Sequence, residues 1–77
     1  MIPDAILDAG ESGCSELVML VFQKIQTLQP GQLLEVHAYD VAAYIDLAAW
    51  CRMTHNPLVE YDLSLNPQRF FIQKQAP

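Results

Sequence analysis

The feature that most constrains this fold is a repeated change in the spacing of apolar residues along the chain. Short apolar runs and alternating patterns predict strands, whereas a recurrence every three to four positions predicts helices. Within 77 residues these patterns follow the order strand, helix, strand, helix, strand, strand. The predicted strands are residues 5–8, 33–38, 58–63 and 69–74, and the predicted helices are residues 14–29 and 41–54.

Residues that interrupt regular structure stand between these segments. Proline cannot continue the hydrogen-bond ladder of a helix, so Pro30-Gly31 is expected to end the first helix and Asn56-Pro57 the second. Asp40 is expected to cap the second helix, its carboxylate accepting amide hydrogens of the next turn. Residues 64–67 are expected to form the hairpin turn that joins the last two strands.

Each predicted helix has an apolar side that we expect to face the sheet. In the first helix this side comprises Val18, Val21, Phe22, Ile25 and Leu28. In the second helix it comprises Ala43, Leu47, Trp50, Cys51 and Thr54. In the strand between the helices, Leu34, Val36 and Ala38 should point to one side, and Leu33, Glu35 and His37 to the other.

These elements predict an α/β (α+β) fold, a βαβαββ two-layer sandwich. Strands joined by a helix favour parallel pairing through a right-handed connection, whereas the last two strands pair antiparallel. Both helices would then cover one face of a four-stranded mixed sheet. We expect residues 1–77 to form a single domain with its core in about residues 5–74, because a chain this short has room for only one core.

Composition excludes several classes of function. Hydrophobic residues make up 52% of the chain and charged residues 17%, which is typical of a folded domain. The net charge of −5 opposes binding to nucleic acid or to an anionic membrane, because both depend on basic residues. The longest strictly apolar run, residues 17–22, is too short to span a bilayer. Nothing at the N-terminus resembles a secretory signal, so we expect none. We therefore expect a cytoplasmic protein.

The two cysteines have different expected roles. Cys14 follows a turn rich in glycine and serine and begins the first helix, where free amides and the helix dipole lower the pKa of a thiol. From position alone, Cys14 is either a reactive thiolate or a residue that merely begins a helix. Cys51 lies on the core side of the second helix. With His37 and His55 the cysteines do not show metal-ligand spacing, so we expect no metal and no cofactor.

Several segments, in this order and spacing, carry a family resemblance from about Ala5 to Lys74. They are Leu7-Asp8-Ala9, Cys14, Val18-Met19, Gln29-Pro30-Gly31, Leu33-Leu34, Asp40, Asp46-Leu47, Trp50-Cys51, Leu58-Val59 and Arg69-Phe70-Phe71-Ile72-Gln73-Lys74. The chain thereby resembles the TusA (SirA-like) family of small sulfur carriers. The resemblance implies the same βαβαββ fold with sheet order 1-2-4-3.

The resemblance also implies a function and partners. In that family a cysteine within a Cys-Pro-x-Pro motif receives a persulfide sulfur, typically from a cysteine desulfurase, and relays it to a downstream acceptor protein. Cys14 is the position that matches this cysteine. The chain reads Cys14-Ser15-Glu16-Leu17 instead, without either proline. Glu11 and Glu16 flank the thiol, and their charge disfavours a thiolate, whereas any protein that docks at this acidic loop is expected to be basic.

A second apolar group lies on the predicted second helix, away from its core side. It consists of Val41, Tyr44, Ile45 and Ala48. Such a group favours a surface that contacts a partner or forms a homodimer through this helix. The alternatives are a helix turned by about 100°, one residue's step, which would bring this group inward and leave Trp50 at the edge, and scattered exposure without a role.

Three hypotheses follow. The first is a sulfurtransferase-type carrier that holds sulfur on Cys14. The second is a non-catalytic TusA-like binding module that uses the second helix, with Cys14 incidental. The third is a thiol redox sensor based on Cys14.

Overall fold

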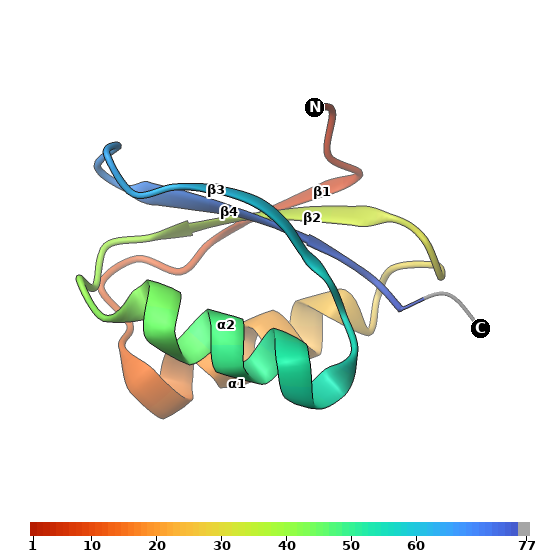
Figure 1. The fold of residues 1–77 in the computed structure, drawn as a ribbon, viewed down its shortest axis with the longest axis horizontal. Coiled ribbons are helices and arrows are strands. Elements are labelled where there is room, and N and C mark those ends of the chain that lie inside the picture. Colours follow the sequence, from red (N-terminus) through yellow and green to blue (C-terminus); the bar gives the residue numbers. More distant parts are fainter. Residues whose placement is uncertain (76–77) are drawn as a thin grey trace.

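The chain folds as a four-stranded sheet covered on one face by two helices, as Figure 1 shows. The structure is a computed structural model that describes residues 1–75, with Cys14 described by its backbone alone. In chain order the elements are β1 (Ala5–Asp8), α1 (Cys14–Ile25), β2 (Leu33–Ala38), α2 (Ala43–Thr54), β3 (Leu58–Asp62) and β4 (Gln68–Gln73). The sheet order is β1-β2-β4-β3, with β1 and β2 parallel and the other pairs antiparallel. The predicted fold class and sheet order are therefore confirmed.

The core lies between the helices and the two central strands. The alternation predicted for β2 is confirmed, because Leu34, Val36 and Ala38 are completely buried on the helix side. On β4, Phe70 and Ile72 are equally buried and pair with Val36 and Leu34. A central strand in a two-layer sandwich buries one face against the helices, which is why these inward positions are exclusively apolar.

Helix α1 is shorter and rotated relative to the prediction. It ends at Ile25 instead of Gln29, because the amides of Thr27 and Leu28 bond to carbonyls three residues back, Leu28 N–H to Ile25 O at 3.1 Å. The buried residues are Leu17, Val21, Ile25 and, after the helix, Leu28. Phe22, which we expected in the core, is 44% exposed. The buried stripe follows a spacing of four from Leu17, so the residue one step beyond Val21 points away from the sheet.

Helix α2 begins at Ala43, two residues later than predicted. The Asp40 carboxylate does accept an amide hydrogen, from Ala42 at 2.9 Å, and the Asp40 carbonyl accepts another from Ala43 at 3.0 Å. These bonds form a tight turn over Val41 and Ala42, so Ala42 occupies the cap position instead of Asp40.

The side of α2 that faces the sheet is the predicted one. Ala43, Leu47 and Cys51 are buried, and Trp50 and Thr54 are half-buried beside them. The alternative of a helix turned by one residue's step is therefore wrong.

The hairpin of β3 and β4 is confirmed, with shifted ends. Both strands end one residue earlier than predicted, at Asp62 and Gln73, and β4 begins one residue earlier, at Gln68. Asp62 holds the start of the turn by accepting hydrogen bonds from the Ser64 hydroxyl at 2.6 Å and the Ser64 amide at 2.9 Å. These bonds lower the pKa of Asp62, since they favour the ionised carboxylate.

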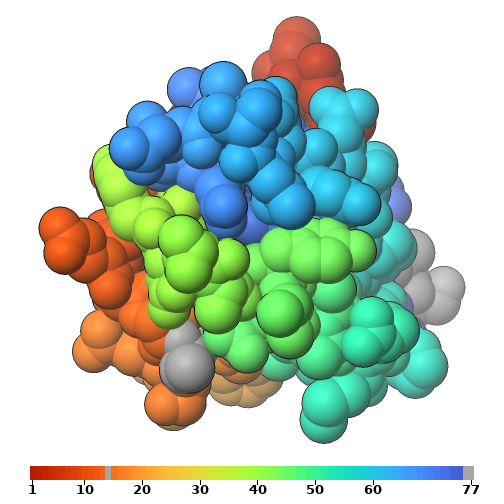
Figure 2. Space-filling model, turned by 60° about the vertical axis from the view of Figure 1, so that its left-hand side comes forward, coloured from red at the N-terminus to blue at the C-terminus, as the bar shows by residue number. Residues whose placement is uncertain are grey.

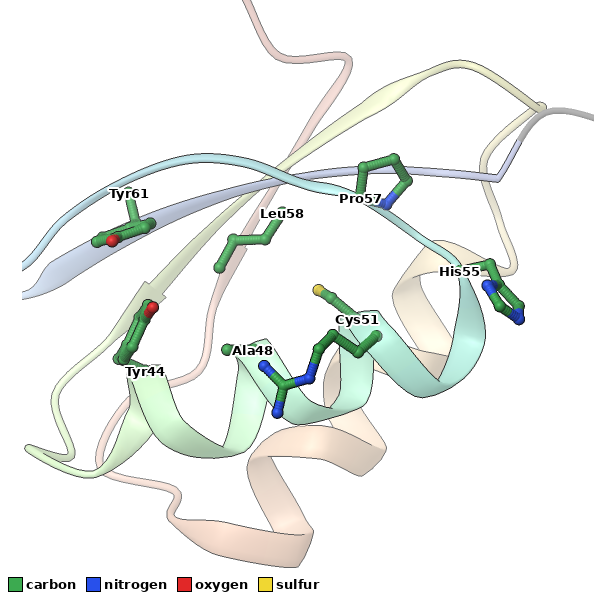
Figure 3. A pocket seen from close by; sticks show the side chains of 8 residues that line it. Tyr44, Ala48, Cys51, His55, Pro57, Leu58 and Tyr61 are labelled. Atoms are coloured by element: carbon green, nitrogen blue, oxygen red, sulfur yellow. The ribbon is translucent and has the colours of Figure 1, made fainter.

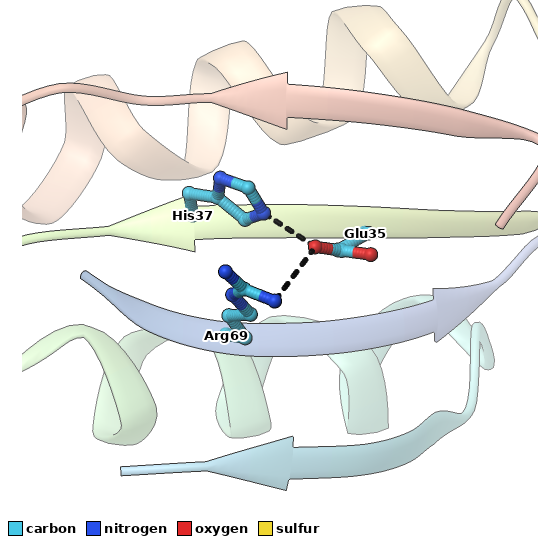
Figure 4. A network of polar contacts seen from close by, with 3 residues as sticks. All are labelled: Glu35, His37 and Arg69. Carbon is cyan, nitrogen blue, oxygen red and sulfur yellow. Dashed lines mark hydrogen bonds and ion pairs between the residues drawn. The ribbon is translucent and has the colours of Figure 1, made fainter. Parts of the chain in front are cut away.

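The face of the sheet away from the helices carries a polar network. Glu35 is only 7% exposed there, and its Oε2 lies 2.5 Å from Nε2 of His37 and 3.9 Å from Nη1 of Arg69 (Figure 4). His37 and Arg69 are directly opposite each other on β2 and β4. A buried carboxylate needs hydrogen-bonding or charged partners, and these two side chains supply them.

Candidate functional site

The loop before α1 places the backbone of Cys14 at the start of the helix. Gly10 turns the chain with a φ of +59°, and its N–H donates to Asp8 Oδ1 at 2.9 Å. Gly13 occupies the cap position in an extended conformation and forms no side-chain cap hydrogen bond. Its carbonyl accepts from the amides of Glu16 and Leu17 at 3.1 and 3.2 Å. No side chain at the cap competes for the positive end of this helix.

The loops that precede the two helices are in close contact. A Cβ at Gly13 would collide with Oδ2 of Asp40, so any larger residue there would require that carboxylate to move. Figure 2 shows this face of the molecule, with the segment before α1 lying beside the segment before α2. The start of α1 and the residues around Asp40 therefore form one continuous surface.

This surface is acidic. A hollow of about 320 Å³ is lined by Glu11, Tyr39 and Asp40. Glu16, in the first turn of α1, is exposed. Carboxylates on both sides of the loop produce a negative potential, which attracts basic partners and repels acidic ones.

A groove between α1 and α2 begins next to Cys14 in the sequence. It has a volume of about 340 Å³ and is lined by Ser15, Val18, Asp46, Ala49, Trp50 and Met53. Oδ2 of Asp46 is buried and has no hydrogen-bond partner among the described residues. Met53 is 79% exposed at the groove. An unpartnered carboxylate oxygen in an apolar groove suits a basic side chain.

The four residues of the predicted contact surface divide into two pairs. Val41, in the turn before α2, is 90% exposed, and Ile45 is 69% exposed. Tyr44 and Ala48 are half-buried and face β3 instead of solvent. The structure thus leaves Val41, which directly follows Asp40, and Ile45, one turn further along, as an exposed apolar pair.

A larger hollow lies between α2 and β3, and the sequence did not lead us to expect it. Its volume is about 490 Å³. It is lined by Tyr44, Ala48, Cys51, Arg52, His55, Pro57, Leu58 and Tyr61, most of which Figure 3 labels. The turn at Asn56-Pro57 makes β3 run back along α2. This turn was the signal in the sequence that could have indicated that the helix and the strand line one hollow.

The thiol of Cys51 lies in the floor of this hollow and points toward β3 (Figure 3). Cys51 is 4% exposed, and burial raises its pKa from 9.0 to about 11. A thiol with that pKa is protonated at neutral pH, and the protonated form is a poor nucleophile. The placement agrees with the expected core position of Cys51.

Neither a metal site nor a membrane-spanning helix is found in the part of the chain that the structure describes. Among the described histidine, cysteine, aspartate and glutamate side chains, which do not include that of Cys14, no three are close enough to hold one metal ion. Within residues 1–75, no helix has both the length and the apolar character needed to cross a membrane.

Comparison with known proteins agrees with this architecture. A family model described as sulfurtransferase TusA matches residues 5–74. A sulfur carrier protein TusA from Pseudomonas paraeruginosa is 37% identical over 73 residues, which cover 95% of this chain and 92% of the relative. A sulfur carrier protein TusA from Pseudomonas putida is 34% identical over 74 residues, 96% of this chain and 92% of the relative. Since the match extends over nearly the whole length of a fold that also has the expected sheet order, the chain belongs to the TusA family of sulfur carriers.

Proposed function

We propose that this protein carries sulfur as a persulfide on Cys14 and passes it to an acceptor protein. The observation that supports this most strongly is the family match over residues 5–74, a range that contains Cys14, the position at which the family resemblance leads us to expect the sulfur-carrying cysteine. The position is also chemically suitable, because α1 begins at this residue. The positive end of a helix dipole favours a thiolate over a thiol.

The transfer requires no net oxidation. The Cys14 thiolate attacks the terminal sulfur of a donor persulfide, forming a new S–S bond while the donor's own S–S bond breaks and its cysteine leaves as a thiolate. A nucleophile on the acceptor then takes the terminal sulfur, and the Cys14 thiolate is regenerated. A cysteine desulfurase is the donor that we propose.

The second cysteine does not suit this role. Burial raises the pKa of Cys51 to about 11, so only about one molecule in ten thousand carries the thiolate there at pH 7. The thiol also faces β3 in the floor of a hollow instead of a docking surface. We therefore expect sulfur to load onto one of the two cysteines.

Mass spectrometry tests the proposal directly. After incubation with a cysteine desulfurase and cysteine, the intact protein should gain about 32 Da, the mass of one sulfur atom, and peptide mapping should assign it to Cys14. Cys51→Ala is the matched control and should load fully, whereas Cys14→Ser should not load. An unchanged mass, in a protein whose Cys14 still reacts with iodoacetamide, would contradict sulfur carriage.

We further propose that the donor docks on the acidic surface beside α1 and on the exposed pair Val41 and Ile45. The acids Glu11, Asp40 and Asp46 favour a basic partner, and attraction of this kind weakens as salt is added. Val41 and Ile45 supply the apolar area that such a contact needs. A homodimer through α2 and a non-catalytic binding module are the competing uses of the same surface.

Lysine substitutions separate these uses. Val41→Lys with Ile45→Lys should slow loading from the desulfurase roughly tenfold or more, while loading from a small-molecule persulfide stays unchanged. Ile2→Lys with Ile6→Lys adds the same charge at side chains that are 91% and 57% exposed, and should have no effect. Sedimentation of both variants shows whether the protein forms a homodimer and whether the substitutions at Val41 and Ile45 disrupt it. If loading from the small-molecule persulfide slowed as much as loading from the desulfurase, the substitutions would be acting on the cysteine and not on docking.

A further inference from the structure

The hollow between α2 and β3 is not needed for sulfur carriage on Cys14, yet it has the form of a ligand site. Its volume of about 490 Å³ lies within the range of small-molecule pockets. The floor is apolar, formed by Ala48, Leu58 and the protonated thiol of Cys51. In Figure 3, Tyr44 and Tyr61 lie at one end of this floor and His55 at the other.

The aromatic end is formed by two tyrosine rings set at an angle to each other. The rings of Tyr44 and Tyr61 have their centroids 4.7 Å apart and are tilted by 48°. Hydrogen bonding with Tyr44 and then repulsion from it raise the pKa of Tyr61, so its phenol is uncharged at neutral pH. Neutral aromatic side chains contact planar apolar groups favourably and do not repel an anion as a carboxylate would.

The charge of the lining is opposite to that of the molecule. The chain carries nine acids and four bases, yet none of the described lining residues is acidic. Arg52 lines the hollow and is exposed, and within residues 1–75 it forms no ion pair. Arg69, by contrast, is paired with Glu35. The hollows lined by Asp40 and by Asp46 are acidic. A cation without a partner beside an apolar floor complements a ligand that has an apolar body and an anionic group.

We propose that this hollow binds a small organic acid, with its flat apolar body on Ala48 and Leu58 against the two tyrosine rings and its carboxylate at Arg52. A small molecule fits better than a protein strand. The adjacent edge strand β3 is short, follows Pro57, carries the exposed acids Glu60 and Asp62, and is bulged, all of which oppose pairing with another strand.

The test compares two probes of one shape in titrations of the full chain followed by amide chemical shifts. The first probe is 2-naphthoate, and the second is its neutral analogue 2-naphthamide. Naphthoate should shift the amides of Ala48, Arg52, Leu58 and Tyr61 in a saturable manner at concentrations up to roughly 5 mM, and naphthamide should bind about tenfold more weakly. Equal affinity for the two probes, shifts elsewhere on the molecule, or no saturable shifts would overturn the proposal.

Two variants identify the groups responsible. Arg52→Gln changes an exposed side chain and should weaken naphthoate about tenfold, to the level of naphthamide. Lys24→Gln, which removes one positive charge from α1 outside the hollow, should leave both affinities unchanged and serves as the control. Ala48→Phe should fill the floor and abolish binding of both probes. Equal weakening in the Arg52 and Lys24 variants would mean that net charge is responsible, and the assigned site would be wrong.

Discussion

Two cysteines of the same chain differ in chemistry because of where their backbones lie. Cys14 is the first residue of a helix, whereas Cys51 is in the last turn of one, on the side that packs against the sheet. The first position concentrates unpaired amides, which favour negative charge. The second removes the thiol from water, and desolvation disfavours the thiolate. Two residues of identical chemistry are thereby separated into a proposed nucleophile and a core side chain.

The raised pKa of Cys51 predicts how stability changes in alkaline solution. The folded-state pKa of about 11 lies above the ordinary value of 9.0, so the folded state retains a proton that the unfolded state has lost between these values. This contribution to stability is complete below pH 9 and is lost as the pH rises to 11, with a slope of at most about 1.4 kcal/mol per pH unit.

Urea unfolding of the wild type and of Cys51→Ala, measured from pH 8 to pH 11, checks this prediction. The absolute stability of the variant will be lower because a cavity replaces the thiol. The gap in unfolding free energy between the two proteins should narrow as the pH rises through this interval, because the variant has no thiol to titrate at position 51. A gap that stays constant would show that the Cys51 pKa is not raised in the folded state.

At the scale of elements, the sequence located every helix and strand but placed several ends wrongly. Helix α2 begins at Ala43 because the Asp40 side chain takes the amide of Ala42 and closes a turn first. Local competition of this kind is common for aspartate, which explains why it resembled a cap in the sequence. The end of α1 likewise depends on local hydrogen bonds, because the amides of Thr27 and Leu28 bond to carbonyls three residues back.

The contact between the loops that precede the two helices predicts an unusual effect of replacing Gly13 by alanine. The backbone of Gly13 has φ −119° and ψ 171°, which alanine adopts readily, so backbone strain is absent. The added methyl would displace the Asp40 carboxylate and break its bond to the Ala42 amide. Gly13→Ala should therefore destabilise the protein by about 1 kcal/mol, although alanine usually stabilises at a compatible glycine site.

A double-mutant cycle with Asp40→Ala checks the cause. In that background the collision is absent, so Gly13→Ala should cost clearly less in thermal unfolding, with only the poorer N-cap preference of alanine remaining. Equal destabilisation in both backgrounds would place the cause elsewhere in the loop. Because Gly13 directly precedes Cys14, the single variant should also load sulfur on Cys14 more slowly.

At the scale of the whole molecule, the β1-β2-β4-β3 order places β3 at the edge of the sheet above α2. A bulge between Leu58 and Glu60 then decides which side chains face the helix. Without it, strict alternation would put Leu58 and Glu60 on the same side. With it, Tyr61 pairs with the buried Phe70 and turns toward Tyr44, which forms one end of the hollow.

Periodicity predicted most of the fold and one part of the candidate site. The buried faces of β2 and α2 were visible because each depends on spacing within a single element. The exposed position of Phe22 was not visible in the sequence. Two adjacent stripes on α1 are apolar, and only the packed structure shows which of them lies against the sheet. Of the predicted contact surface, Val41 and Ile45 are exposed as expected, but Tyr44 faces β3, a strand that begins beyond the end of α2.

By itself the sequence determined the element order, the four-stranded βαβαββ fold and the membership of the TusA family, because these depend on patterns along the chain. Only the tertiary structure decided that Glu35 is buried between His37 and Arg69, that Gly13 lies against Asp40, and that α2 and β3 enclose a hollow containing Arg52 but no described acid. The physical reason is that burial and close approach depend on atoms from segments far apart in sequence. A local pattern of residues carries no record of those neighbours.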